Sequence, residues 1–195
     1  VVGIAAGAGA LSVPAAYRGA SVVAIDIAPG MVKLLSERLK PFPRCAVHEM
    51  DGEALKLESE SFDAAFSIIG VNLFTDFRQG LREQARVPKP RGRACVATWK
   101  EPRGGGPFQI MAEALRSVFP DRPPPAPPEG FVALSDPARL ADAMREAGFV
   151  DVDVEQIEAA WGGPAGDAYL EDLKELHPYM GAYAALDAKG RAKVD

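Results

Sequence analysis

The sequence predicts an α/β protein with a doubly wound, mostly parallel sheet and helices on both of its faces. Short apolar runs alternate with helical patterns from residue 1 to residue 98, which is the order of elements in such a sheet. The runs are blocks of apolar residues, as expected for parallel strands that are covered on both sides. With 195 residues, 48% of them hydrophobic, the chain is large enough for one folded domain with a sizeable core.

The first strand of this sheet runs into a turn of small residues. Val1 to Ile4 is apolar, and Gly7 and Gly9 follow in a Gly-x-Gly spacing. Glycines at the end of a strand let the backbone approach a ligand where a Cβ would intrude. The N–H groups of the following helix, expected at 11–18, favour negative charge. Taken alone, this pattern also fits a strand-to-helix turn that binds no nucleotide.

A second apolar run, Ser21 to Ile25, ends in the carboxylate of Asp26. A small-residue turn followed by a carboxylate at the end of the next strand is half of a nucleotide-binding β-α-β unit. In such a unit the carboxylate accepts hydrogen bonds from a ribose diol. The dinucleotide fingerprint has a third glycine where this chain has Ser12, so the pattern does not identify the nucleotide. Asp26 is also compatible with a second role, capping the helix that follows it.

The remaining elements follow from apolar spacing and from Gly and Pro as stop signals. A Pro-rich stretch from Asp121 to Gly130 predicts a stiff extended loop rather than a linker between domains, because the element pattern resumes after it. The expected elements are, in order, a helix at 31–39, strands at 45–49 and 62–69, a helix at 76–86, a strand at 93–98, a helix at 137–147, an alternating strand at 150–157, and helices at 167–183 and 187–194.

Charge and cysteine content exclude several classes of protein. The formal net charge of −5 disfavours nucleic acid or an anionic membrane as the main partner. Cys45 and Cys95 lack Cys-x-x-Cys or Cys/His clustering, which indicates reduced cysteines and implies no metal. No apolar stretch resembles a signal peptide or a membrane span, so we expect a cytoplasmic protein, or an organelle-matrix protein if a presequence precedes this chain. The chain opens without a methionine inside a strand, so we expect further residues upstream.

Five stretches of the chain share a pattern with a known family: residues 1–9 with Asp26, 51–54, 62–76, 85–93 with 97–99, and 140–154 with its Glu-Ala-Gly-Phe core. In this order and spacing they resemble the class I S-adenosylmethionine-dependent methyltransferases, closest to the ubiquinone/menaquinone-biosynthesis-type group. The resemblance implies a Rossmann-like sheet in the family order 3-2-1-4-5-7-6. It also implies a single methyltransferase-like domain over 1–195, with a cofactor-binding half at 1–100 and a substrate-side half at 101–195.

The resemblance further implies S-adenosylmethionine as the cofactor and assigns roles to residues. The small-residue turn would pack against the amino-acid end of the cofactor, and Asp26 would take its ribose hydroxyls. Ile27 and Met31 would contact the adenine, while Gly52 would leave room for the base. Asp51 would accept a hydrogen bond from the exocyclic amine of the adenine. The alternative is that Asp51 is an exposed turn carboxylate without a ligand. The cofactor-binding residues implied in this way are Ala5, Ala6, Gly7, Gly9, Asp26, Ile27, Met31, Asp51, Gly52, Glu53, Ser67, Ile68 and Ile69.

We assign no catalytic base. The methyl group of a sulfonium is already activated, so in-line displacement is accelerated mainly by holding donor and acceptor in place and by excluding water. His48 lies in an expected strand and His177 in an expected helix, where a structural role and packing are the favoured interpretations over the acceptor pocket. Asn72, Phe74 and Asp76 are interpreted as core and helix-cap residues rather than as catalysts.

The chain departs from the family pattern at several positions. Gly3 stands where the family usually has an acidic residue, and Ala5 replaces the first glycine of the turn. Pro88 and Arg91 alter the Leu-x-Pro-Gly-Gly turn that precedes the fifth strand. A non-glycine residue where φ > 0 is preferred costs about 1 kcal/mol without abolishing binding. The pattern after Ile157 is helical, and the family's seventh strand is not identified in it.

The function expected from these observations is methyl transfer from S-adenosylmethionine to a small-molecule acceptor. A catalytically degenerate scaffold or assembly factor in a protein/RNA complex is the alternative, motivated by Gly3 and Arg91. A nicotinamide-dependent oxidoreductase is disfavoured by Ser12 and by the lack of a Tyr-x-x-x-Lys pair. Nucleic acid is disfavoured as a direct substrate, whereas a protein complex or a homodimer is compatible with the sequence. The acceptor itself is not identified by the sequence.

Overall fold

The computed structural model describes residues 1–100, 107–122, 126–158, 166–168, 171, 177 and 180–194. Contacts divide the chain into two compact units, each of which is described by itself. The first unit consists of Val1–Lys100 with Pro128–Val154, and the second of Glu101–Pro127 with Glu155–Asp195. Residues 128–154 thus return to the first unit after the chain has left it, whereas the single domain over 1–195 stays a prediction.

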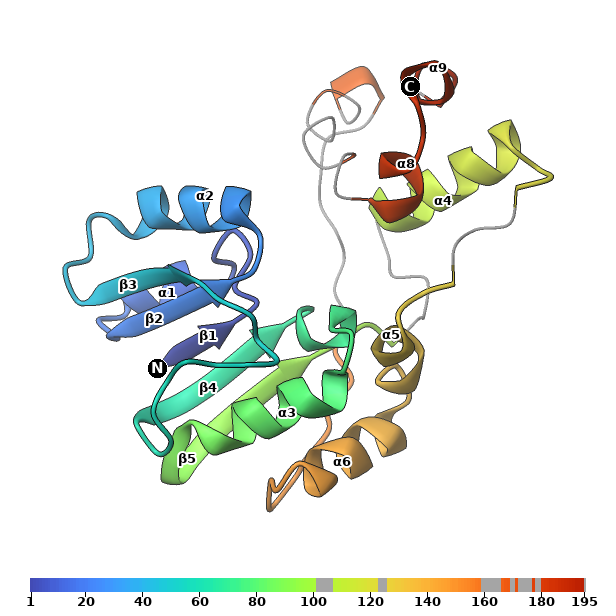
Figure 1. Ribbon diagram of the computed structural model, residues 1–195. Coiled ribbons are helices and arrows are strands. Elements are labelled where there is room, and N and C mark those ends of the chain that lie inside the picture. Colours follow the sequence, from blue (N-terminus) through green and yellow to red (C-terminus); the bar gives the residue numbers. More distant parts are fainter. Residues whose placement is uncertain are drawn as a thin grey trace. The chain divides into compact units, whose positions relative to one another are not determined.

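A five-stranded parallel sheet forms the centre of the first unit (Figure 1). The strand order is β3-β2-β1-β4-β5, so that the chain winds outward from β1 in both directions. This result confirms the predicted doubly wound parallel sheet. The strands are β1 (Val2–Ile4), β2 (Val22–Asp26), β3 (Cys45–Glu49), β4 (Phe62–Ile68) and β5 (Pro88–Ala97).

The two faces of the sheet are covered by different helices. Alternate residues of a strand point to opposite faces. On β2, Val22 and Ala24 pack with Ala16 and Leu35 from the helices on one side, whereas Ile25 belongs to a cluster on the other side. The helices that supply these contacts are α1 (Ser12–Tyr17) and α2 (Pro29–Leu39).

Helices on the opposite side begin at capping residues that the sequence predicts. The side chain of Asp76 accepts a hydrogen bond of 3.0 Å from the N–H of Gln79, and that of Asp136 accepts one of 2.9 Å from the N–H of Arg139. The helices are α3 (Phe77–Arg86) and α6 (Pro137–Glu146). A 3-10 turn, η1 (Val71–Leu73), and a short helix, α5 (Glu129–Ala133), join this side and were not predicted.

The second unit contains helices around a small apolar cluster. Met111, Met180, Tyr183 and Leu186 form this cluster, and the ring of His177 lies 5.2 Å from that of Tyr183. The packing interpretation of His177 is therefore confirmed. The described helices are α4 (Pro107–Val118), which was not predicted, α8 (Gly181–Ala184) and α9 (Ala188–Arg191). Most of the helix expected at 167–183 and part of the Pro-rich loop, residues 123–125, lie outside the described residues.

Two predictions about strands are wrong. β5 begins at Pro88 rather than at residue 93, because Phe62 pairs with Pro88 across an irregularity in the register. Residues 150–157 form no strand. Their alternation has another cause, because Val152 and Val154 pack against the cluster of α3 and α6, while Val150 is 84% exposed. Among the described residues no strand follows β5, which pairs only with β4 and stays an edge strand of the sheet.

Candidate functional site

The turn between β1 and α1, residues 5–11, lies at the carboxyl edge of the sheet and is called the glycine turn below. Its backbone is fixed to β2, since the N–H of Ala6 donates to the carbonyl of Ile25 at 2.8 Å. The N–H of Gly9 closes the turn on the carbonyl of Ala6 at 2.9 Å. Ala5, at φ +50°, is left-handed like Gly7 and Gly9, so alanine is strained at a position that suits glycine.

The two glycines of this turn serve different purposes. A Cβ at Gly9 would lie 2.5 Å from Leu35 Cδ1 and 2.9 Å from Val13 Cγ2, so this glycine lets α2 approach the turn. A Cβ at Gly7 would meet no heavy atom within 4 Å. Gly7 therefore faces open space, as expected where a backbone has to come close to a ligand.

Asp26 ends β2 beside the glycine turn and is only 8% exposed. Its Oδ2 accepts from the N–H of Gly7 at 2.7 Å, and its Oδ1 accepts from the N–H of Ala28 at 2.9 Å. A carboxylate has about four acceptor positions, so two remain for a ligand. The bond to Ala28 joins residues two positions apart and closes an Asx turn before α2. The N-cap residue of α2 is Ala28 and the helix has no side-chain cap, so the alternative role of Asp26 as a cap is wrong.

Two apolar side chains follow Asp26 at the start of α2. Ile27 is 67% exposed and Met31 is half-buried. An exposed isoleucine at the carboxyl edge of a parallel sheet is suited to covering an apolar ligand face. The contact of both residues with adenine stays a prediction.

The loop between β3 and β4, residues 50–61, brings three more predicted residues to this edge. It joins β2 because the N–H of Met50 donates to the carbonyl of Asp26 at 3.0 Å. Asp51 is exposed, and its Oδ1 accepts from the N–H of Glu53 at 2.8 Å. This geometry matches the alternative of an exposed turn carboxylate, while its second oxygen makes no bond with the described residues.

Gly52 and Glu53 are engaged within the protein. A Cβ at Gly52 would collide with the ring of Phe74 and lie 3.1 Å from Ile4 Cγ2, so the glycine makes room for Phe74. The Glu53 carboxylate accepts from the N–H groups of Thr75 at 2.7 Å and Asp76 at 3.2 Å. These contacts give both residues a structural task, and their contact with cofactor stays a prediction.

The same loop is tied to α3 by hydrogen bonds to an ion pair on that helix, which sequence reasoning missed. Arg86 and Glu83 meet at 2.7 Å, with their side chains 32% and 13% exposed. Arg86 also donates to the carbonyls of Leu55 and Leu57, and Glu83 accepts from the N–H of Leu55. The hydrogen bond from Arg86 lowers the pKa of the Glu83 carboxyl below its ordinary value, although burial opposes this shift.

The end of β4 comes next to the glycine turn. A Cβ at Gly70 would lie 2.6 Å from Ala5 Cβ, so the two turns touch. Ser67 is fully buried, and its Oγ accepts from the N–H of Val71 at 3.1 Å. Ile69 has φ +55°, a rare conformation for a β-branched residue, and such strain clusters at binding sites. Ile68 is the last residue of β4 and is half-buried.

Unpaired polar atoms lie buried near these turns. Asn72 is 1% exposed, and its Oδ1 has no hydrogen-bond partner. The Oγ of Ser12 is also buried and unpaired, and it lies 2.9 Å from the place of a Cβ on Gly3. Buried polar atoms are normally paired, so each one indicates a strained or a ligand-dependent position. Asn72 is buried as predicted, but its polarity has no structural use in the described residues.

The absent side chain at Gly3 is replaced by an aromatic ring. A Cβ on Gly3 would lie 2.8 Å from Cε2 of Phe66, the residue paired with Gly3 across β1 and β4. The acidic residue that the family usually has here would collide with this ring. The departure at Gly3 is therefore matched by Phe66, which the sequence analysis did not connect with it.

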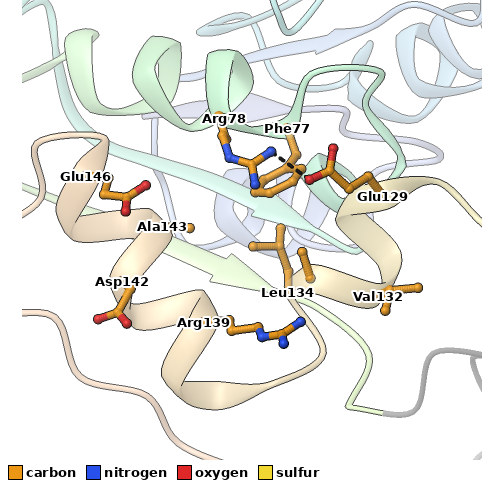
Figure 2. Close-up of a pocket in the computed structure, with 10 residues that line it drawn as sticks. Phe77, Arg78, Glu129, Val132, Leu134, Arg139, Asp142, Ala143 and Glu146 are labelled. Carbon is orange, nitrogen blue, oxygen red and sulfur yellow. Dashed lines mark hydrogen bonds and ion pairs between the residues drawn. The ribbon is translucent and has the colours of Figure 1, made fainter.

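A groove of about 540 Å³ lies elsewhere in the first unit, among α3, α5 and α6 (Figure 2). Its apolar floor includes Phe77 and Leu134, and Arg78 bridges one side by an ion pair of 2.9 Å with Glu129. None of the predicted cofactor residues lines it. Its size alone does not make it the cofactor site.

Two classes of feature are absent from the described residues. In this part of the chain no three His, Cys, Asp or Glu side chains are grouped so that they could hold a metal ion. None of the helices described here has the length and apolarity needed to cross a membrane.

Comparison with known proteins identifies the family. Residues 2–96 match the sequence model of the family described as "Methyltransferase domain". The chain is 35% identical over 161 residues to the demethylmenaquinone methyltransferase of Corynebacterium urealyticum, covering 78% of this chain and 68% of the relative. The chain belongs to the class I S-adenosylmethionine-dependent methyltransferases, ubiquinone/menaquinone type. The family's cofactor is S-adenosylmethionine, as the resemblance implied.

Another relative of this methyltransferase is named for a different acceptor. The malonyl-[acyl-carrier protein] O-methyltransferase of Halorhodospira halophila is 31% identical over 164 residues, covering 82% of this chain and 50% of the relative. The chain thus spans between half and about two thirds of the length of the two named relatives. The comparisons give no support to the scaffold alternative.

Solved structures agree on the fold of the methyltransferase. An S-adenosylmethionine-dependent methyltransferase from Thermotoga maritima matches with a TM-score of 0.52 and 23% identity, covering 77% of this chain and 63% of that one. The [4+2]-cyclase SpnF matches with a TM-score of 0.55 and 20% identity, covering 75% and 49%. Because a cyclase shares this fold, the fold alone does not decide the reaction.

Proposed function

We propose that this chain transfers a methyl group from S-adenosylmethionine to a small-molecule acceptor at the carboxyl edge of the first unit. The observation that carries the proposal is the bond of 2.7 Å between the N–H of Gly7 and Oδ2 of Asp26. It joins the open glycine of the turn to the carboxylate of the next strand. A ligand with a ribose and a charged amino-acid end would meet both groups at once.

The residues present fit this cofactor. The free side of Gly7 admits a ligand against the backbone, and Asp26 retains acceptor positions for a diol. Exposed Ile27 offers an apolar surface for a base. The proposed contacts are those of the thirteen residues named from the resemblance, with Asp51, Gly52 and Glu53 at the adenine end and Ser67, Ile68 and Ile69 at the methionine end.

The bound cofactor supplies an activated methyl group, whose bond to sulfur breaks as the bond to the acceptor forms. The task of the protein is then to hold the two partners in line and to exclude water. The turn at Ala5 and the turn at Ile69, which meet through Gly70, would form the wall behind the donor. No side chain is proposed as a base.

For the acceptor we propose a quinone of the demethylmenaquinone kind. The support is the name of the Corynebacterium urealyticum relative. The malonyl thioester named for the Halorhodospira halophila relative is the second candidate, supported by an alignment over 82% of this chain. The named organisms are bacteria, which gives no support to the expectation of an organelle matrix.

Titration calorimetry with S-adenosylmethionine, S-adenosylhomocysteine and NADH tests the cofactor. We expect micromolar binding of the first two and none of NADH. Transfer of a labelled methyl group to reduced demethylmenaquinone, compared with malonyl-acyl-carrier protein, tests the acceptor. Absence of binding by a folded sample would reject the proposed cofactor site, whereas binding with transfer only to the malonyl thioester would reject the quinone.

A further inference from the structure

An arginine on α2 reaches back to the glycine turn. Nη1 of Arg38 donates to the carbonyl of Ala8 at 2.7 Å, although the two residues are thirty positions apart in the sequence. Arg38 is exposed, and its bond to Ala8 is the contact that its guanidinium makes among the described residues. A charged donor makes a stronger hydrogen bond to a carbonyl than a neutral one.

This bond adds another anchor to the backbone of the turn. The carbonyl of Ala8 is held by Arg38, and the N–H of the same peptide group, at Gly9, is held by the carbonyl of Ala6. The N–H of Gly7 is held by Asp26. The space beside Gly7 is nevertheless open. The backbone of the turn is thus held at Gly7, Ala8 and Gly9, while the space beside Gly7 stays free.

Three residues of α2 that concern the site lie on one face of the helix. Met31, Leu35 and Arg38 are spaced by four and three residues, which places them on one face of a helix. Leu35 fills the space beside Gly9, and Met31 is the proposed adenine contact. This face of α2 therefore contacts the turn in two ways. Leu35 packs beside Gly9, and Arg38 binds the backbone at Ala8.

We propose that Arg38 is a positioning residue for the cofactor, which holds the carbonyl of Ala8 and thereby keeps Gly7 turned toward the ligand. This inference rests on the proposed function. Because Arg38 is exposed, water can replace its bond to Ala8 when the guanidinium is removed. The loss then falls on the order of the turn and not on the stability of the whole unit.

The test compares Arg38→Met, Arg38→Lys and Arg44→Met. Arg44 is a matched control, since its Nη2 also donates to a backbone carbonyl, that of Gly19, in the turn at the other end of α1. We expect Arg38→Met to raise the Kd for S-adenosylhomocysteine about fivefold, the size of one exposed hydrogen bond. KM for S-adenosylmethionine should rise equally, with kcat within about twofold and the thermal midpoint within about 2 °C.

The lysine variant keeps a charged donor on a chain of similar length, so it should restore most of the affinity. Arg44→Met should leave the Kd unchanged. Unchanged affinity of Arg38→Met, or equal losses in Arg38→Met and Arg44→Met, would overturn the inference while the wild type still binds the cofactor. Lack of binding by the wild type would instead overturn the proposed function, and the inference with it.

Discussion

The glycine turn (residues 5–11) and the β3–β4 loop (residues 50–61) lie at the same edge of the sheet but use their polar groups differently. In the loop, the carboxylate of Glu53 is occupied by backbone N–H groups, and Arg86 binds two of the loop's carbonyls. In the turn, Asp26 and Arg38 hold the backbone at Gly7 and Ala8, and the space beside Gly7 is empty.

The difference shows that a carboxylate or a glycine is not by itself a sign of a ligand. Glu53 and Gly52 have internal partners that explain their presence, namely the backbone before α3 and the ring of Phe74. Gly7 has no such partner within 4 Å, and Ala5 is strained beside it. We therefore expect a substitution at Gly7 to affect cofactor binding, and substitutions at Gly52 or Glu53 to affect stability.

The largest effect is expected from Gly9→Ala. A Cβ there would overlap Leu35 in a left-handed conformation, which should lower the free energy of unfolding by about 3 kcal/mol. Gly7→Ala is the matched variant, with about 1 kcal/mol of strain and no collision. Urea unfolding combined with cofactor titration separates the two. A stable Gly7→Ala protein with wild-type affinity would show that the ligand does not approach this glycine.

Arg86→Met should destabilise the protein by about 2 kcal/mol. The substitution leaves Glu83 without its charged partner and frees the carbonyls of Leu55 and Leu57. Arg82→Met is the control, because its ion pair with Asp76 is long, at 3.8 Å, and exposed, which predicts less than about 0.5 kcal/mol. Chemical unfolding of both variants measures the difference. Equal effects would mean that Arg86 does not anchor the loop.

Asp26→Ala should weaken cofactor binding by about 1 to 3 kcal/mol, because a buried acceptor for the ribose diol is lost. Asp51→Ala removes an exposed carboxylate from the other region, and its effect should be smaller, about 1 kcal/mol or less. Calorimetry on folded variants compares them. An unchanged affinity in Asp26→Ala would remove this carboxylate from the site.

The ion pair that anchors the loop should also make the stability of the protein depend on pH in the acidic range. Arg86 lowers the pKa of Glu83 in the folded state from 4.5, so the unfolded chain takes up this proton at a higher pH. The stabilisation is complete above about pH 4.5 and is lost as the pH falls through the lower folded pKa. Denaturant midpoints measured between about pH 3 and 6 should fall less steeply for Glu83→Gln than for the wild type. Parallel curves would contradict the assignment.

The smallest effect is expected from Ala5→Gly. Glycine relieves the left-handed strain but adds freedom to the unfolded chain, so the gain should be about 0.5 kcal/mol. A thermal midpoint about 1 to 2 °C above that of the wild type would support it. A decrease would show that contact of the Ala5 methyl with Gly70 outweighs the strain.

The sequence by itself determined the parallel sheet, the glycine turn and Asp26. Each follows from local information: apolar blocks of strand length, glycines after a strand, and a carboxylate after the next strand. The caps at Asp76 and Asp136 are local too, since a capping side chain binds an N–H only three residues ahead. The alternation at 150–157 misled the prediction, because a half-buried extended segment has the same pattern whether or not a neighbouring strand pairs with it.

Only the tertiary structure decided which residues from distant parts of the chain contact these local features. Arg38 and Ala8 are thirty residues apart, Phe66 fills the space above Gly3, and Phe74 fills the space beside Gly52. No spacing rule predicts such pairs, because they depend on which elements the sheet order brings together. In the folded protein Glu53 binds the backbone at Thr75, and Phe74 packs beside Gly52. Gly7 stays open because no neighbouring side chain reaches the space beside it, whereas protein interiors are otherwise closely packed.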